Sequence, residues 1–464
     1  MGIIAVIIRV NGTSRHTVDR VTPEQSLDDA ATAPIPVILQ RPLWRDTFSS
    51  LRIHNYRLYV VSQLISNTSG WAMRIAIDWL VFELTGSVAL VGVTVALQFG
   101  PMLFLGPFGG VVADRYPKRR LLVTTQAING VACTVLAILT ISGVVVVWQV
   151  FATALVMGCV AVVDSPARSV FVNEMVGHGK LGNAISINAS IFHLGGLVGP
   201  AISGILIAIV GAGWSIAANG LAAGIVVVTL LSMRTAELLP SLVASRSKGQ
   251  IREGLRYVLA KPTIFWPIVM LAFVATFGMN LPVMLVAFAD HVFGSGAAGY
   301  GLYSSAAALG ALAGAIASTR RRAYRLRSIM LAAGCFGLAV AASGIAPVVA
   351  VFLLCLAAIG FTRLLFATAA ESIVQMSSNR IIRGRVMAIY SMVVLGGQAI
   401  GGPLMGWLAE QWGVRTAMVA SGMVPAVAAI VIAVLLARTG RLSLHFRLRR
   451  RIVPISIEVR GQLG

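Results

Sequence analysis

The sequence predicts an all-α membrane protein with twelve transmembrane helices, arranged as two six-helix halves with both chain termini in the cytoplasm. Of the 464 residues, 57% are hydrophobic and only 11% are charged, and the mean hydropathy is +0.86. A soluble domain contains about 25% charged residues, so these few charges could not cover a water-exposed surface. Two further observations, the positions of the basic residues and an internal repeat, lead to the same fold class.

The apolar stretches provide room for twelve helices and for no large soluble domain. A membrane-spanning helix needs about 20 residues, and about 380 residues lie between the two polar ends of the chain. The expected helices cover about 57–83, 88–112, 121–142, 147–171, 184–210, 213–233, 264–289, 299–318, 328–346, 348–375, 386–409 and 414–437.

The basic residues are concentrated on one side of this arrangement. The formal net charge of +21 would also suit a protein that binds nucleic acid, but the positions of the charges argue against that. Of the 37 Lys and Arg residues, 34 lie in the tails or in the loops on the side of the tails, Arg415 alone lies on the other side, and Arg74 and Arg363 lie within helices. Cytoplasmic loops carry this positive excess, so both termini are predicted to be cytoplasmic, in a multi-pass protein of the inner membrane.

An internal repeat divides the chain into halves. The segments that begin at Gly110 and Gly314 are similar, the Gly-Pro pair at 199–200 recurs at 402–403, and these offsets are 204 and 203 residues. Repeated halves with a site between them are the usual build of secondary transporters. The predicted parts are a partly disordered N-terminal tail over 1–55, halves over 56–233 and 263–437, a linker over 234–262 and a basic C-terminal tail over 438–464.

The linker contains the pattern of a short amphipathic helix. Between residues 250 and 260, apolar side chains recur at helical spacing with Arg252 and Arg256 between them. A helix of this kind lies on a membrane surface with its apolar face in the lipid. A helix that binds a partner protein is the alternative.

The segment 110–120 closely resembles the cytoplasmic loop signature of the major facilitator superfamily. The resemblance implies a latch between the halves, in which Asp114 meets the start of the eleventh helix near Arg385. Pro117 stands where the family usually has Gly, and Ser318 replaces the Asp in the second copy, so we expect a weaker latch there. The gating candidates are Gly110, Asp114, Arg115, Lys118 and Arg119.

The segment 195–204 resembles the fifth-helix motif of proton-coupled exporters in the same superfamily, with Ser203 where Gly is usual. Small residues four apart form a helix contact face and proline bends a helix, so tight packing alone could also explain it. The motif residues are Gly195, Gly199, Pro200 and Gly204. The stretches 70–81, 164–168 and 383–390 are similar to a bacterial group of enterobactin-exporter-like and multidrug proton antiporters.

Charged residues inside the membrane are candidates for coupling, because each costs about 3 kcal/mol on insertion scales. Arg74 and Asp78 are four residues apart on one helix face, so they can pair, and protonation could neutralise the Asp78 carboxylate. A permanent structural ion pair is the alternative. On the first interpretation, Asp78 and Arg74 are the first candidates for proton coupling.

Four further charged residues are weaker candidates for the same role. Asp164 and Arg168 repeat the spacing of four residues near the cytoplasmic end, where a structural pair is favoured. Arg363 lies in the middle of a helix and could attract an anionic or polar substrate, and Glu371 lies too far along that helix for a close pair.

Polar and aromatic residues within the expected helices could line a central cavity, although helix packing would also explain any one of them. They are Trp71, Gln98, Asn188, Phe192, Asn280, Tyr390 and Gln398.

The sequence holds no catalytic, cofactor or metal motif. The segment 294–299 fits G-x-G-x-x-G but has no strand-helix context, and the four cysteines lie in apolar segments with no His at ligand spacing. We therefore expect no enzyme activity, no cofactor and no metal.

The predicted function is proton-driven export of a small amphipathic compound, such as a drug or a siderophore, by alternating access of a monomer in the lipid bilayer. The alternatives are an importer or uniporter of a small metabolite, and a membrane scaffold or sensor that transports nothing. The fifth-helix motif favours export, and the charges within the helices argue against a scaffold.

Overall fold

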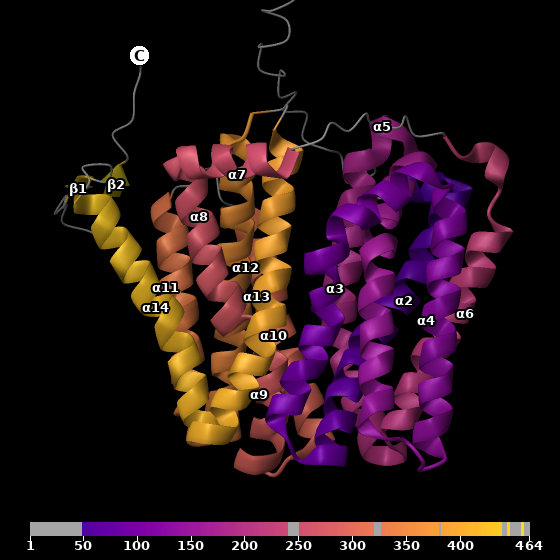
Figure 1. Ribbon diagram of the computed structural model, residues 1–464, viewed down its shortest axis with the longest axis horizontal. Coiled ribbons are helices and arrows are strands. Elements are labelled where there is room, and N and C mark those ends of the chain that lie inside the picture. The colour runs from indigo at the N-terminus through magenta and orange to yellow at the C-terminus, as the bar shows by residue number, and fades with distance from the viewer. Residues whose placement is uncertain are drawn as a thin grey trace, which may run out of the picture. The chain divides into compact units, whose positions relative to one another are not determined.

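The computed structural model is almost entirely helical over the residues that it describes (Figure 1). Most of the predicted N-terminal and C-terminal tails and part of the linker lie outside these residues. The described ranges are 49–239, 250–319, 326–379, 382–438, 443–445 and 456–458.

The first group of helices lies before the linker. Its elements are η2 (Ser49–Arg52), α2 (His54–Thr85), α3 (Val88–Arg115), α4 (Lys118–Ile141), α5 (Val147–Val210), α6 (Ala212–Ser232) and η3 (Thr235–Glu237). The helix α5 contains two membrane-length segments, Val147–Gly177 and Lys180–Val210. They meet at Gly177, whose φ of 67° is accessible to glycine at little cost.

The second group follows the linker helix α7 (Gln250–Ala260). Its elements are α8 (Pro262–Phe273), η4 (Val274–Gly278), α9 (Leu281–Ala287), η5 (Phe288–Val292), α10 (Gly296–Thr319), α11 (Leu326–Gly344), α12 (Val349–Ser377), α13 (Arg383–Trp412) and α14 (Val414–Arg438). The elements η4 and η5 are π-helical turns that interrupt one membrane-length segment. After α14, β1 (Ser443–His445) pairs antiparallel with β2 (Ser456–Glu458), with Ser443 opposite Glu458.

Eleven helical segments within the described residues are long and apolar enough to cross a membrane. The chain is therefore a multi-pass membrane protein. The helix α2 corresponds to the first expected span and is 32 residues long. It is more polar than the others, because it contains Arg57, Arg74, Asp78 and Glu83.

Helix packing defines the two groups and the contacts that join them. In the first group α2 packs on α5 and α6, α3 on α5, and α4 on α6; in the second group α10 packs on α12, and α11 on α12 and α14. Among the described residues, the most extensive contacts that join the groups are α3 with α13 and α5 with α10, and smaller contacts join α9 to α2 and α3, and α10 to α2. The ribbons of the groups separate toward the end that carries α7 (Figure 1).

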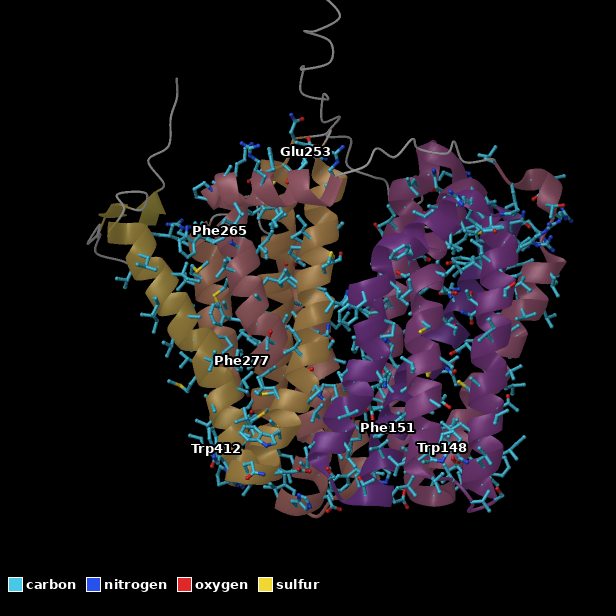
Figure 2. All side chains as sticks on the ribbon, viewed as in Figure 1. Trp148, Phe151, Glu253, Phe265, Phe277 and Trp412 are labelled. Carbon is cyan, nitrogen blue, oxygen red and sulfur yellow. The ribbon has the colours of Figure 1, made fainter. Side chains whose placement is uncertain are left out.

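We call the end with α7 and the α3–α4 turn the basic end, and the end with the α2–α3 and α13–α14 turns the far end. Figure 2 shows Glu253 at the basic end, and Trp148 and Trp412 near the far end. Both tryptophan side chains are exposed. Exposed tryptophans near the ends of apolar helices are typical of the membrane–water interface.

Glycines allow the two groups to approach closely in the half of the bundle nearer the far end. A Cβ atom at Gly301 of α10 would lie 2.6 Å from the carbonyl oxygen of Pro200 and 2.8 Å from Cα of Gly204, both in α5. In the α3–α13 contact, a Cβ atom at Gly92 would lie 2.9 Å from Cα of Pro403. Neither contact leaves room for a side chain.

The helix α7 occupies the stretch where the linker was predicted to be helical, and it is bonded to the second group. Glu253 forms an ion pair with Arg385 of α13. The hydroxyl of Tyr257 accepts hydrogen bonds from the backbone N–H of Asn379 (3.1 Å) and from Nζ of Lys261 (2.7 Å). The linker helix therefore moves with the second group.

The close approach at Gly301 predicts that Gly301→Ala lowers stability by about 1–3 kcal/mol, because α5 and α10 must move apart to fit the methyl group. The measurement is the midpoint of thermal unfolding in detergent. Gly224→Ala is the matched control, since nothing lies within 4 Å of its added Cβ. Equal midpoints for the two variants would contradict the packing described.

Candidate functional site

The carboxyl group of Asp78 lies between the two groups of helices. Asp78 belongs to α2, and its residue surface is only 3% exposed. Its Oδ2 atom accepts a hydrogen bond from the hydroxyl of Tyr300 in α10 at 2.9 Å. Its Oδ1 atom is buried and has no hydrogen-bond partner among the described residues. One buried carboxyl oxygen is thus bonded across the groups and the other is unpaired.

Arg74 lies one helical turn from Asp78 and does not form the predicted ion pair. Its Cζ atom lies over the rings of Trp71 (5.1 Å to the centroid) and Phe99 (5.3 Å), and no ion pair within the described residues includes it. The helical spacing allows the pair, but Asp78 is held by Tyr300 and the guanidinium lies on aromatic faces. In this conformation the two side chains interact electrostatically without a direct ion pair.

An aromatic and cationic cluster surrounds Arg74 and extends to the second group. The ring of Phe192 in α5 contacts Trp71 edge-on at 5.5 Å and is 50% exposed. The adjacent ring of His193 contacts Phe192 at 5.8 Å and interacts electrostatically with Arg363 of α12. Arg74 is itself exposed. Residues of α2, α3, α5 and α12 therefore converge at this cluster.

The predicted pair of Asp164 and Arg168 forms inside the first group. Arg168 donates from Nη2 (2.6 Å) and Nε (2.9 Å) to Oδ2 of Asp164. The other carboxylate oxygen accepts from Thr125 (2.8 Å) and Gln126 (3.1 Å) of α4. Because both oxygens are bonded, the arrangement suits a structural pair. Glu371 is exposed and accepts a hydrogen bond from Gln375 (3.0 Å).

Two basic residues of the 110–120 segment, Lys118 and Arg119, contact other residues of the first group. Arg119 donates to the carbonyl oxygens of Leu230 (2.6 Å) and Leu231 (2.7 Å), near the end of α6. Lys118 lies 3.9 Å from the carboxylate of Glu174.

The structure does not describe the latch that was expected from the same segment. The side chain of Asp114 lies outside the described residues, Arg115 is exposed, and Gly110 is half-buried. Arg385, the expected meeting point of the latch, pairs with Glu253 of α7.

The fifth-helix motif packs α5 against helices of both groups. A Cβ atom at Gly195 would lie 3.0 Å from the backbone of Asn67 in α2, and one at Gly199 would lie 2.8 Å from Cβ of Trp71. A Cβ atom at Gly204 would lie 2.9 Å from the carbonyl oxygen of Ala297 in α10. The motif, with Pro200 beside Gly301, therefore sets the distance between the two groups.

Four predicted cavity residues form hydrogen bonds within the protein. Asn280 donates to the carbonyl oxygens of Ala275 (3.3 Å) and Thr276 (2.9 Å), next to the π-helical turn η4. Tyr390 donates to Ala367, Gln398 donates to Val394, and Asn188 accepts from Tyr56, each at 3.5 Å. Nε2 of Gln98 is buried without a partner among the described residues.

Sequence reasoning missed several residues of the site. Phe99, His193 and Tyr300 carry no local motif, and they matter only because folding brings them into interaction with Arg74, Arg363 and Asp78.

Glu410 of α13 was also missed. One of its carboxylate oxygens accepts hydrogen bonds from the hydroxyl of Ser87 (2.5 Å) and from the backbone N–H of Ala89 (3.0 Å), so it stabilises the start of α3. A cavity of about 570 Å³ lies beside it at the far end, lined in part by Gly86, His291 and Arg415.

Residues 45–450 match the family described as transmembrane secretion effector, a family of the major facilitator superfamily, and the chain belongs to it. The chain is therefore a membrane transporter and not an enzyme. It is 26% identical over 403 residues to the enterobactin exporter EntS of Shigella boydii serotype 4 (strain Sb227), covering 86% of this chain and 95% of that protein. It is also 26% identical over 414 residues to EntS of Escherichia coli (strain K12), covering 88% and 97%.

Solved transporter structures share the fold. A bacterial homologue of the human lysosomal transporter Spinster, in an inward-facing and unoccupied conformation, matches with a TM-score of 0.64 and 16% identity, over 83% of this chain and 97% of that one. A POT family transporter in complex with a thioalcohol-conjugated peptide matches with a TM-score of 0.66 and 12% identity, over 82% and 96%.

The bond between Asp78 and Tyr300 predicts that Tyr300→Phe weakens closure of the far end by about 1.5–3 kcal/mol, because a hydrogen bond to a carboxylate is lost. The measurement is the distance between spin labels at Val144→Cys and Ile345→Cys, both exposed far-end sites, in a chain without its four native cysteines. The distribution should gain longer distances.

Tyr303→Phe is the control for that measurement, since the Tyr303 hydroxyl bonds to Ser295 (2.8 Å) within the second group. Unchanged distances in Tyr300→Phe, or the same change in both variants, would contradict a role for Tyr300 in closing the far end.

Proposed function

We propose that the chain is a proton-driven exporter of a small compound, built as twelve spans with both termini in the cytoplasm. In this arrangement α2 is the first span and adds to the eleven more apolar ones, and the halves are 56–233 and 263–437. The excess of Lys and Arg near the basic end supports a cytoplasmic position for that end. We take the conformation described, in which close glycine contacts join the groups toward the far end, to be the one that is closed on the side away from the cytoplasm.

The single observation that carries the proposal is the buried carboxyl group of Asp78, bonded to Tyr300 across the groups with one oxygen unpaired. Removing a carboxylate from water is expensive, whereas removing a neutral carboxyl group costs much less. Closure of the far end buries Asp78, so binding of a proton and closure of the far end favour each other. A single side chain can thereby link the proton gradient to the conformation.

Proton binding that favours closure of the far end has the direction required for export of cargo in exchange for protons. When the far end opens, Asp78 meets water on the side with the higher proton concentration and takes up a proton, while the cargo leaves. The neutral carboxyl group then favours return to the conformation with a closed far end. Loss of the proton to the cytoplasm makes burial of Asp78 costly again and promotes the next opening with new cargo bound.

The cargo is proposed to be a small compound of the siderophore or drug kind, carried by a monomer in the inner membrane. The similarity to enterobactin exporters supports a siderophore, at 26% identity. The packing role of the fifth-helix motif is compatible with export and with other transport modes, so the direction of transport needs a functional measurement.

The proton linkage predicts that Asp78→Asn abolishes proton-driven accumulation in everted vesicles, because the amide cannot release a proton. The assay uses a panel of siderophores, including enterobactin, and amphipathic drugs, and follows proton release together with uptake of each compound that wild-type vesicles accumulate. Asp290→Asn is the control, since Asp290 is exposed at the far end and should leave exchange unchanged.

Undiminished coupling in Asp78→Asn would remove Asp78 from the mechanism. Accumulation that needs no proton gradient would indicate a uniporter, and proton entry together with substrate in the opposite direction would indicate an importer. Neither substrate movement nor proton movement with any member of the panel would support the scaffold alternative.

A further inference from the structure

Arg363, within a membrane-spanning helix, has no bonding partner among the residues that the structure describes. It lies in the middle of α12 and is half-buried. Within the described part of the chain it forms no ion pair, hydrogen bond or ring contact. A charge at this depth is costly and is normally compensated by protein or water.

Other arginines in the helices show how the chain compensates a structural charge. Arg168 is paired with Asp164. Arg415 donates to the carbonyl oxygens of Gly344 (3.2 Å) and Ala346 (2.8 Å) and lies over the ring of Phe293 (5.9 Å). Within the described residues Arg363 has none of these contacts, so its positive charge is available to a bound molecule.

The surroundings of Arg363 indicate what it would bind. His193 of α5, in the first group, interacts with it electrostatically, and an imidazole can donate an N–H to an anion. The ring of Phe192 contacts His193 at 5.8 Å, is half exposed and contacts Trp71 edge-on. Two N–H donors and an exposed aromatic ring therefore belong to one cluster.

We propose that Arg363 and His193 bind an anionic group of the transported compound, and that an aromatic ring of the same compound packs on Phe192 against Trp71. This inference rests on the proposed transport function and names its substrate class, a planar aromatic anion. A guanidinium binds carboxylates and similar anions through paired N–H donors, and aromatic rings favour stacked or edge-on contacts.

The site spans both groups of helices. Arg363 belongs to the second group, and His193, Phe192 and Trp71 belong to the first. An anion held between them would be bound most tightly when the groups have the spacing seen in this conformation. When the far end opens and the groups move, the two sets of contacts separate, and the affinity falls where release is needed.

The test is calorimetric binding of 2-naphthoate to the full chain in detergent, compared with neutral 2-naphthamide and with the non-aromatic anion cyclohexanecarboxylate. Wild-type protein should bind 2-naphthoate more tightly than either. Arg363→Gln should weaken 2-naphthoate binding by about 10- to 100-fold, because hydrogen bonds to a charged group are lost. Phe192→Ala should weaken it by about three- to tenfold.

Controls separate binding from folding. Arg363→Lys keeps the charge and should retain part of the affinity, and thermal unfolding midpoints identify a variant that has lost its fold. Arg256→Gln removes an exposed positive charge of α7 at the basic end and should not change binding. Equal loss in Arg256→Gln and Arg363→Gln would reduce the effect to net charge and overturn the proposal.

Two further results would overturn the substrate class. They are equal affinity for 2-naphthoate and 2-naphthamide, and no saturable binding of 2-naphthoate to the wild-type chain. Either result leaves proton-driven export intact if the vesicle assay with Asp78→Asn behaves as proposed. Conversely, tight binding of 2-naphthoate through Arg363 would stand even if that assay showed no proton coupling.

Discussion

The scarcity of water in the hydrocarbon core of a membrane is the constraint on which this structure depends. Each charge placed there must be met by an opposite charge, a carbonyl group, an aromatic face or a bound molecule. The chain meets most of its internal charges inside one group of helices, as with Arg168 and Asp164 or with Arg415 and the carbonyl groups near the end of α11. Such contacts can persist when the groups move.

A different set of polar contacts depends on how the groups are placed. Asp78 with Tyr300, and Glu410 with the start of α3, join the groups toward the far end. Arg363 and His193 interact electrostatically across the groups. The glycines at the α5–α10 and α3–α13 contacts let the backbones meet there without intervening side chains. Motion of one group against the other must change these contacts first, which is why they are the natural places for coupling and recognition.

The sequence predicted the helices well, because their apolar length is a local property. Even the two halves of α5 were expected separately, since Gly177 lies in the polar stretch between them. The twelve-span count was less secure, because α2 carries the charges that make it functionally interesting and also make it less apolar than the other spans. The linker helix was predictable because apolar side chains recur at helical spacing there, with basic residues between them.

The candidate site was predictable only in part. Helical spacing identified Arg74 and Asp78 as neighbours, but it could not show that Tyr300, 222 residues away, binds the carboxyl group. Nor could it show that Arg74 would lie between Trp71 and Phe99. Arg363 was recognised as a charge without a nearby acid, whereas His193 became relevant only through its electrostatic interaction with Arg363 in the folded chain. Contacts between groups depend on tertiary structure, which spacing along one helix does not encode.

The central claim is that proton binding at Asp78 favours closure of the far end. It is tested most directly by measuring the far-end distance between spin labels at Val144→Cys and Ile345→Cys as a function of pH, with and without Asp78→Asn. The account predicts that acidification shifts the chain with Asp78 toward the short distance, and that Asp78→Asn keeps the short distance at every pH. An identical pH response in both chains would contradict it.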